Sequence, residues 1–334
     1  MFLSCVIVAK NEEKNIARCI ESVLNCTKDI KDKEILLVDS CSSDRTVEIA
    51  KKCPVNIIGL RPSWKLSPAA SRFSGVNNTT GEYILIIDGD MELQKGWVEK
   101  GLKFMEENPK VAVVVGKQYD VYCQNNSHFA QPKIGRASRG KDKLQKIDYV
   151  YGSSIFRREH LLKVGNFHPY LRAEEEAELS YRLKRKGYFL FFLPYKSTYH
   201  YCISRNTFQE TMRRIKSKLF AGMGDMMRWS LQNKYYSIIW KRFKVFISFL
   251  AYMTVSIAGI VYFAFLNKFI FSVIFGFMPF VFVLLMCIKK KSVYQGILST
   301  LNISIISISL ICGLFHKVDD MSNYPTDVIW IKRA

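Results

Sequence analysis

Apolar and polar positions divide the chain into two regions of different character. Up to about residue 200, short apolar runs alternate with polar turns and amphipathic stretches, whereas beyond residue 242 apolar residues are almost continuous. The short runs predict buried strands at 2–9, 34–39, 55–59 and 84–88. The amphipathic stretches between them predict helices near 16–23, 45–52 and 69–77. This alternation of strand and helix indicates an α/β domain with a parallel, doubly wound sheet.

The pattern is less regular between residues 95 and 200. Further helices are predicted at 95–107 and 174–187, and further strands at 111–116 and 188–194, after which 198–200 (TYH) follow. Residues 120–146 are polar, basic and without clear periodicity. Such a segment is typical either of a solvated loop or of a mobile flap over an anionic ligand, and both alternatives stay open.

Three long apolar runs follow, at 243–265, 269–288 and 296–315. Because about 20 apolar residues cross a bilayer core of ~30 Å, we expect a multi-pass membrane region with about three helices. Ser and Asn residues interrupt the third run, and a re-entrant or surface-lying helix is the alternative there. We therefore expect four parts: a domain over 1–204, basic amphipathic helices over 205–242, the transmembrane region over 243–315 and a tail over 316–334.

The charge of the chain indicates an anionic partner. The net charge is +20, with 49 Lys and Arg against 29 Asp and Glu, and many basic residues lie among aromatics between residues 207 and 244. Such stretches also occur in nucleic-acid-binding proteins, but a position directly before a membrane span favours anionic lipid headgroups. We therefore expect no nucleic-acid partner. Nine cysteines without a CxxC pair indicate reduced intracellular thiols.

Basic residues also predict the orientation in the cell membrane. Lys241 and Arg242 precede the first apolar run, and Lys289, Lys290 and Lys291 follow the second. Because Lys and Arg accumulate in cytoplasmic loops, both positions are expected in the cytoplasm. The domain over 1–204 is then cytoplasmic as well.

Polar side chains follow three of the predicted strands. Asp88 ends the run 84–88 with Asp90 just after it, Asp39 ends the run 34–39, and Asn11 and Glu12 follow the first strand. Carboxyl ends of parallel strands meet at one edge of a sheet, where open α/β sheets bind their ligands. Paired carboxylates there suit Mg²⁺ or Mn²⁺, whereas an acidic turn is the simpler alternative. Gly89 is expected to let a ligand approach the backbone.

Motifs in four parts of the chain resemble the family 2 glycosyltransferases of GT-A fold. They are residues 8–13 (VAKNEE), 38–46 (VDSCSSDRT), 81–90 (GEYILIIDGD), and 164–167 (VGNF) together with 175–179 (EEAEL). The resemblance covers about residues 1–200. It implies a GT-A doubly wound mixed sheet, a nucleotide-diphosphate-sugar donor, a divalent metal, Mg²⁺ or Mn²⁺, and inversion at the anomeric carbon.

The resemblance also implies roles for individual residues. The implied nucleotide-sugar contacts are Ala9, Asn11, Glu12, Asp39, Arg72, Asp88 and Gly89. Asp90 is implied to be the main metal ligand, with Asp88 and His200 as further contacts. Glu176 lies where the family usually places an Asp acting as base, and the neighbouring Glu175 is the alternative for this role.

Two features of the sequence restrict the type of sugar transfer and of acceptor that we expect. The Q-x-x-R-W motif of processive polysaccharide synthases is absent, since Gln209 is followed by Arg213 at a different spacing and without Trp. A carboxylate base is needed only for a hydroxyl acceptor, because a phosphate acceptor is already ionised. The acidic run 174–176 therefore favours a hydroxyl acceptor.

The sequence thus predicts a glycosyltransferase acting on a lipid-linked or membrane-proximal glycan, as in cell envelope polysaccharide biosynthesis. Transfer to polyprenyl phosphate is the alternative enzymatic reaction. A non-catalytic GT-A-like membrane binding protein is the alternative from a different class, and the intact pair of Asp88 and Asp90 argues against it. A haloacid-dehalogenase-type phosphatase also contains a D-x-D motif, but its motif continues to Thr or Val where this chain has Glu92.

Overall fold

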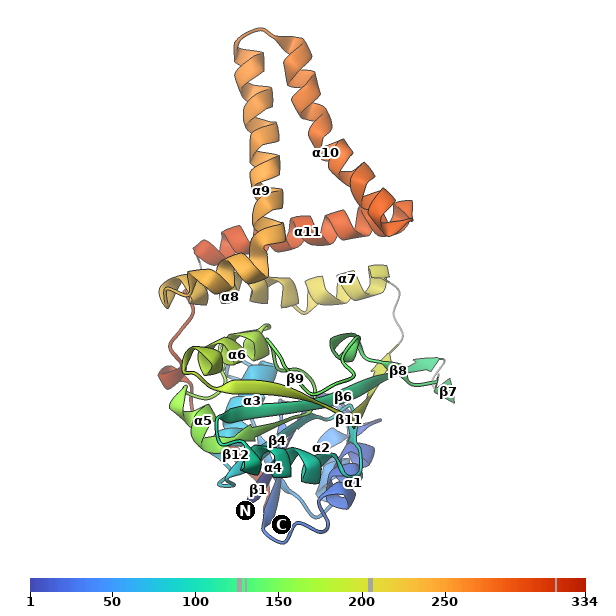
Figure 1. Cartoon of the computed structure of the whole chain (residues 1–334), viewed down its shortest axis with the longest axis vertical. Helices are drawn as coiled ribbons and strands as arrows, with labels where there is room; N and C mark the ends of the chain where they lie inside the picture. Colours follow the sequence, from blue (N-terminus) through green and yellow to red (C-terminus); the bar gives the residue numbers. More distant parts are fainter. Residues whose placement is uncertain (125–127, 130, 204–206, 316) are drawn as a thin grey trace. The chain divides into compact units, whose positions relative to one another are not determined.

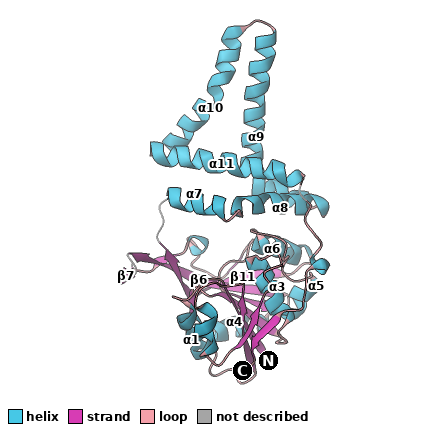
Figure 2. Cartoon of the chain, turned by 180° about the vertical axis from the view of Figure 1, so that it is seen from behind, coloured by secondary structure: helices cyan, strands magenta, loops and turns pink. Residues whose placement is uncertain are grey.

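The computed structural model describes residues 1–124, 128–129, 131–203, 207–315 and 317–334. The chain forms two units, one of Met1–Ser204 with Asp319–Ala334 and one of Arg205–Val318. The first unit contains all the strands described and the second is helical, as the colours of Figure 2 show. The chain therefore leaves the first unit once and returns to it near its C-terminus.

One mixed sheet forms the centre of the first unit (Figure 1). Its strand order is β12-β3-β2-β1-β4-β10-β6-β11-β5. Its strands are β1 (Leu3–Ala9), β2 (Lys33–Asp39), β3 (Asn56–Gly59), β4 (Tyr83–Asp88), β5 (Met91–Leu93), β6 (Val111–Gln124), β10 (Ser154–Arg157), β11 (Phe189–Ile203) and β12 (Ile329–Lys332). The short strands are β7 (His128–Phe129) and β8 (Lys133–Ile134), which pair with β6, and β9 (Gln145–Lys146), which pairs with β11. Strands β1 to β4 are parallel, whereas β10, β5 and β12 run antiparallel to their neighbours. The predicted α/β class and the mixed sheet implied by the resemblance are confirmed.

Helices cover both faces of this sheet. Those packed on one face are α1 (Ile16–Cys26), α2 (Thr46–Lys51) and α4 (Trp97–Glu107). Those on the other face are α3 (Pro68–Asn77), α5 (Arg158–Lys163) and α6 (Glu175–Arg185). Strand β1 shows why two layers form, because Cys5 and Ile7 join the first core while Val6 and Val8 join the second. Successive side chains of a strand point to opposite faces, so an uninterrupted apolar strand needs cover on both.

The segment 120–146 differs from the loop or flap expected there. Strand β6 continues from Val111 to Gln124, and its second half pairs in parallel with β11 as far as Ile203. Strand β11 likewise continues beyond the predicted 188–194, as one bulged strand as far as Ile203. Alternation of Gln118 and Asp120 with Tyr119 and Val121 suits a strand, and pairing with β11 satisfies its backbone groups. The prediction was therefore wrong for 120–124.

The C-terminal residues complete the first unit. Strand β12 pairs antiparallel with β3, with Ile329 opposite Gly59. The ring of Tyr324 lies edge-on to Trp64, Phe73 and Tyr170, at centroid distances of 5.6, 5.7 and 5.3 Å. Tyr324 is buried and belongs to the same hydrophobic core as residues of α3 and α6. This end of the segment expected as a tail is thus an edge strand and part of a hydrophobic core.

The second unit consists of helices joined by short turns. They are α7 (Thr207–Lys216), α8 (Leu219–Gln232), α9 (Tyr236–Phe265), α10 (Phe269–Lys290) and α11 (Val293–Leu314). Helices α9, α10 and α11 are long and apolar enough to cross a membrane. Helices α9 and α10 form an antiparallel hairpin, in which the hydroxyls of Tyr252 and Ser256 each donate a 2.8 Å hydrogen bond to a carbonyl of α10. The three apolar runs predicted a membrane region, and this helical unit supports membrane association.

Candidate active site

The parallel strands bring the predicted polar residues to one edge of the sheet. In the ladders of β1, Ala9 lies opposite Asp39 of β2 and Val8 lies opposite Asp88 of β4. The carboxyl ends of three strands therefore meet. This is the position at which open α/β sheets place their ligands.

The loops after β1 and β2 hold each other through side-chain hydrogen bonds. Oδ1 of Asn11 accepts from the backbone of Ser43 at 2.8 Å, while the backbone N–H of Asn11 donates to Oγ of Ser42 at 2.9 Å. Oδ2 of Asp39 accepts from the backbone of Ser42 at 3.0 Å. Its Oδ1 is buried and has no hydrogen-bond partner among the described residues. Asn11 therefore shapes the loop, and Asp39 offers an acceptor that the chain itself leaves unused.

Gly89 lies in tight packing between two strand ends. A Cβ at this position would lie 3.0 Å from Cβ of Ala9 and 3.3 Å from Cγ of Glu12. The glycine therefore allows β4 to end against the loop after β1, a reason that the sequence analysis did not contain. Burial raises the pKa of Glu12 to about 7, opposed by its hydrogen bond from Asn15 and aided by the nearby carboxylates of Asp90 and Asp88.

One buried arginine joins three carboxylates from two different elements. Arg72 of α3 lies 3.0 Å from Oδ1 of Asp88 and 2.5 Å from Oε1 of Glu175, both measured from its guanidinium nitrogens. Glu176 is more distant, with its Oε1 3.6 Å from the same guanidinium. Burial of Arg72 opposes its charge, but the three carboxylates outweigh this and raise its pKa. Arg72 thus connects the D-x-D motif to the acidic start of α6.

The two glutamates that the sequence could not distinguish have different surroundings. The side chain of Glu175 is 10% exposed and bound directly to Arg72, whereas that of Glu176 is 30% exposed and only near it. Burial raises the pKa of Glu176 to about 8, with Arg72 lowering it and the charges of Glu175 and Asp88 raising it further. A carboxylate with a raised pKa is suited to accept a proton near neutral pH. Glu176 is the better candidate base.

His200 lies between two carboxylates. Its Nε2 is 3.2 Å from Oδ2 of Asp90, and its Nδ1 is 3.2 Å from Oδ1 of Asp120. Burial opposes protonation of the ring, but the hydrogen bonds to Asp120 and Asp90 outweigh it and raise the pKa of His200. Strand pairing explains the contact, because His200 of β11 is the register partner of Asp120 in β6.

Asp120 and Cys202 were missed by the sequence analysis. Sγ of Cys202 lies 3.1 Å from Nδ1 of His200, so Asp120, His200 and Cys202 form a group that could itself hold a metal ion. The alternating pattern around Asp120 was the available signal, since it predicts a strand whose polar side chains share one face. The distance of Asp120 from His200 depends on the pairing of β6 with β11, which no local pattern reveals, whereas Cys202 lies two residues beyond His200 on β11 itself.

The residues present fit a divalent cation beside Asp90. Oδ1 of Asp90 is buried and without a hydrogen-bond partner within the part of the chain described, and Nε2 of His200 faces the other carboxylate oxygen. Oxygen and imidazole nitrogen are both donors used for such ions. Both oxygens of Asp88, at 3.0 and 3.3 Å, accept from Arg72. Asp90 and His200 are therefore better placed than Asp88 to hold a metal.

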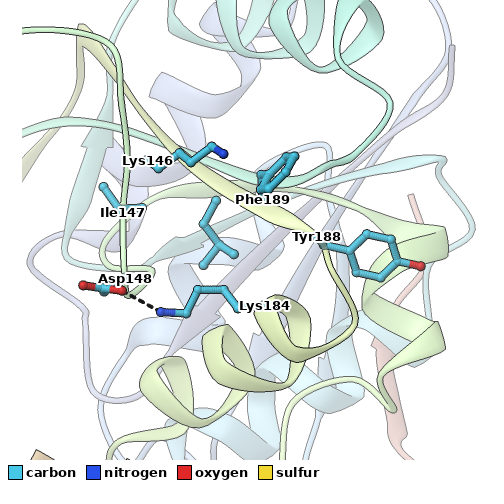
Figure 3. Close-up of a pocket in the computed structure, with 7 residues that line it drawn as sticks. Lys146, Ile147, Asp148, Lys184, Tyr188 and Phe189 are labelled. Carbon is cyan, nitrogen blue, oxygen red and sulfur yellow. Dashed lines mark hydrogen bonds and ion pairs between the residues drawn. The ribbon is translucent and has the colours of Figure 1, made fainter. Parts of the chain in front are cut away.

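A separate pocket lies at the other end of α6. It is lined by Lys146, Ile147, Asp148, Lys184, Tyr188, Phe189 and Leu190, with Nζ of Lys184 2.7 Å from Oδ1 of Asp148 (Figure 3). Glu175 and Glu176 begin this helix, whereas Lys184 lies in its last turn. The pocket therefore does not belong to the site at the strand ends.

Comparisons with known proteins find a matching family for the N-terminal part of the chain. Residues 4–165 match the family described as Glycosyl transferase family 2. Glycosyltransferase AglE of Haloferax volcanii is 25% identical over 245 residues, which are 70% of this chain and 75% of that protein. Dolichyl-phosphate beta-glucosyltransferase ALG5A of Trichomonas vaginalis is 29% identical over 165 residues, 46% of this chain and 50% of that protein. The chain thus spans between half and three quarters of these relatives.

A solved structure agrees with the fold. The structure of GalNAc-T7 with UDP, GalNAc and Mn²⁺ superposes with a TM-score of 0.50 at 16% identity, covering 61% of this chain and 44% of that one. At this identity the likeness concerns the fold alone. It agrees with the GT-A fold that the sequence motifs imply.

Proposed function

Since residues 4–165 of this chain belong to glycosyl transferase family 2, we propose that it transfers a sugar from a nucleotide-diphosphate-sugar to a hydroxyl of a lipid-linked or membrane-proximal glycan, with inversion. The observation that carries the proposal is the connection made by Arg72. This residue joins Asp88 of the D-x-D motif to Glu175 and approaches Glu176. Asp88, assigned to the donor, and Glu176, assigned as the base for the acceptor, are then connected through the charged contacts of Arg72.

The donor nucleotide is assigned to the loops after β1 and β2. Ala9 ends β1, with Asn11 and Glu12 in the loop that follows, and Asp39 ends β2. The unused Oδ1 of Asp39 is a suitable acceptor for a base or ribose hydrogen. Arg72 and Asp88 are assigned to the sugar and ribose end, where the cationic guanidinium also balances the charge of the neighbouring carboxylates.

Asp90 and His200 would hold the cation, Mg²⁺ or Mn²⁺, with Asp88 as a further contact. When bound, such an ion stabilises the negative charge that develops on a departing diphosphate. Asp120 accepts a hydrogen bond from Nδ1 of His200 and so turns Nε2 towards Asp90. A carboxylate in this position orients a metal-binding imidazole, so we assign Asp120 as a positioning residue.

Glu176 is assigned as the base that takes the proton of the acceptor hydroxyl. A positioned base typically contributes ~10²–10⁴-fold to the rate. Glu175 is held by Arg72 and keeps that guanidinium beside Asp88. Inversion follows when the activated hydroxyl attacks the anomeric carbon on the face opposite the departing diphosphate.

Transfer to polyprenyl phosphate is the second candidate. The name of the Trichomonas vaginalis relative, a dolichyl-phosphate beta-glucosyltransferase, favours it, because that acceptor is a membrane-embedded phosphate. Both reactions suit an enzyme held at a membrane by apolar helices. In either case we propose a cytoplasmic catalytic domain at the cell membrane, with a role in building cell envelope glycans.

A panel of nucleotide sugars with membrane lipid extracts, analysed by mass spectrometry, tests the proposal. Purified full-length protein is expected to form a glycosylated product that Asp90→Ala abolishes, because the substitution removes an oxygen assigned to the cation. Asp29→Ala is the control, since Asp29 is an exposed carboxylate outside the site. Full activity of Asp90→Ala, or of the unmodified protein in excess chelator, would refute the metal-dependent reaction.

A further inference from the structure

The path of the chain restricts the number of membrane crossings. The first unit contains both Met1–Ser204 and Asp319–Ala334, so the chain leaves it and returns to it. A folded unit lies on one side of a membrane. A chain that starts and ends on the same side crosses an even number of times. Three candidate spans lie between the two parts of the first unit, so they cannot all cross.

The return of the chain rests on several independent contacts within the first unit. Strand β12 forms backbone ladder pairs with β3, and the ring of Tyr324 is 3% exposed among aromatic side chains from other elements. Nη2 of Arg61 lies 3.0 Å from Oδ2 of Asp327, and the backbone of Ala334 donates to Asn56 at 2.9 Å. A third crossing would remove all these partners and leave β3 as an open sheet edge.

Helices α9 and α10 are the pair best suited to cross together. They are joined by a tight turn at Asn267 and pack along each other, with a Cβ on Gly259 excluded by the ring of Phe275. Basic residues lie at the open end of this hairpin, Lys241 and Arg242 before it and 289–291 after it. Such residues mark the side of the membrane that carries anionic lipid, so both ends of the hairpin belong on the same side.

Helix α11 packs on α8 instead of extending the hairpin. Figure 1 shows α11 running beside α8 and steeply across α9. The two backbones touch, because a Cβ on Gly224 would lie 2.2 Å from the carbonyl oxygen of Ser309, and one on Gly313 would lie 2.3 Å from that of Gly224. Nη1 of Arg228 donates to the carbonyl of Leu314 at 3.1 Å. Helix α8 precedes the hairpin, so its partner α11 lies on the same side.

The free face of α11 is apolar. Ile297, Ile308 and Phe315 are 51%, 59% and 86% exposed, and Leu301 and Ile311 lie on the same exposed side. The opposite face carries Gly296, Ser307 and Gly313, which are buried against neighbouring helices. Basic side chains of the adjoining α7 lie in its last turn, at Arg213, Arg214 and Lys216. An apolar face beside basic residues is typical of helices that lie in the headgroup region of a bilayer.

We propose that only α9 and α10 cross the membrane, while α11 lies flat in the headgroup region together with α8, on the side of the first unit. The partner of the exposed face of α11 is the bilayer itself, with anionic lipid beside α7. This arrangement corresponds to the surface-lying alternative for the third apolar run. It concerns the topology alone and does not depend on the proposed reaction.

Cysteine labelling in the full-length chain tests the number of crossings. Asn267→Cys at the tip of the hairpin and Asp319→Cys after α11 are each treated with a membrane-impermeant maleimide in sealed cells and in inverted vesicles. The unsubstituted protein is the control for labelling of the native cysteines. The two sites are expected to react from opposite sides, so that each is labelled in only one preparation. Labelling of both from the same side would overturn the proposal, whichever way the protein is oriented.

Protection of inserted epitopes from protease is a second measurement of topology. It replaces no native residue, so it remains informative if a cysteine variant fails to fold. An epitope placed after Ala334 and one inserted between Asn267 and Lys268 are exposed to protease in the same two preparations. Opposite protection supports two crossings, and equal protection contradicts them.

Nitroxide depth measurements in anionic vesicles test whether α11 lies flat. Spin labels at Ile297, Ile308 and Phe315 are separated by up to 18 positions on one face, about 27 Å along the helix. A flat helix places all three at the same shallow depth. A crossing helix places Ile308 nearer the bilayer centre than the others. Labels at Phe271 and Leu284 of α10 are the matched control and are expected to differ in depth from labels near the middle of that helix.

Discussion

At the residue scale, a single guanidinium organises the carboxylates at the strand ends. Arg72 is buried in α3, and the charges of Asp88 and Glu175 around it offset the cost of removing it from water. Because Glu175 is bound directly to Arg72, Glu176 is the carboxylate that we propose exchanges a proton with the acceptor. The distinction follows from the distances of 2.5 and 3.6 Å to Arg72.

Glu176→Gln is expected to lower turnover by ~10²-fold or more with donor binding little changed, because the amide keeps the size but accepts no proton. Steady-state kinetics with separately measured donor affinity check this. Glu175→Gln is the control for a base assignment shifted by one residue. If neither substitution lowers turnover, the hydroxyl acceptor is wrong and the polyprenyl phosphate alternative takes its place, since an ionised phosphate needs no base.

The same residue predicts the pH dependence. The pKa of Glu176 is raised to about 8, and a base acts only when deprotonated. Turnover is therefore expected to rise with pH up to about 8 and to level off above it. A pH–rate profile of the unmodified protein beside Glu176→Gln measures this rise. A profile that is unchanged by the substitution would exclude Glu176 as its source.

Asp120→Asn tests the positioning of His200. The neutral amide orients the ring less strongly, and loss of such a carboxylate typically costs 10–100-fold in metal affinity. Mn²⁺ binding measured by electron paramagnetic resonance on the full chain gives this affinity without an activity assay. Cys202→Ser is the matched control and should leave the affinity nearly unchanged. An equal loss in both variants would place the cation on the Asp120 and Cys202 side of the ring.

At the element scale, the C-terminal segment stabilises the α/β unit from its edge. Strand β12 pairs with the outer side of β3, and the ring of Tyr324 packs against Trp64, Phe73 of α3 and Tyr170. The hydroxyl of Tyr324 also donates to the carbonyl of Lys65 at 2.9 Å. The segment thus closes a hydrophobic core that the first 204 residues leave incomplete.

Tyr324→Ala is expected to destabilise the protein by about 3 kcal/mol, because it leaves a cavity among three aromatic rings. Thermal unfolding of the detergent-purified chain measures the change, at roughly 2–4 °C of midpoint per kcal/mol for a unit of this size. Tyr324→Phe keeps the ring and loses only the hydrogen bond, which is worth about 1 kcal/mol. Equal midpoints for Tyr324→Ala and the unmodified chain would show that the segment does not contribute to stability.

At the scale of the whole molecule, the distribution of basic residues and that of apolar residues both favour attachment to a membrane. The excess of basic residues around α7 and the ends of the α9–α10 hairpin accounts for much of the net charge of +20. The apolar residues beyond position 242 supply the membrane helices. A cytoplasmic domain held at the lipid surface would meet both a water-soluble donor and a membrane-bound acceptor.

A cysteine at Lys290 tests this orientation. In a variant without other accessible cysteines, Lys290→Cys is expected to be shielded from an impermeant thiol reagent in intact cells, since basic loops stay in the cytoplasm. Reaction after permeabilisation is the control for accessibility. Ready labelling in intact cells would refute the cytoplasmic orientation, whether α11 crosses or not.

The sequence by itself determined the features that depend on local patterns. Uninterrupted apolar runs between amphipathic stretches were enough to predict strands β1 to β4 and the helices between them, because burial on both faces requires such runs. Since the carboxyl ends of parallel strands share an edge, the meeting of Asp39 with Asp88 also followed. Length and hydropathy were enough to predict the three apolar helices.

The tertiary structure decided what depends on contacts between distant segments. The pairing of β6 with β11 brings Asp120 to His200, and Arg72 separates Glu175 from Glu176, although the two glutamates are neighbours in sequence. The pairing of β12 with β3 likewise restricts the number of membrane crossings, because it returns the chain to its starting unit. Hydropathy measures only whether a helix is apolar enough to cross a bilayer, whereas the connections of the folded chain decide how many helices do so.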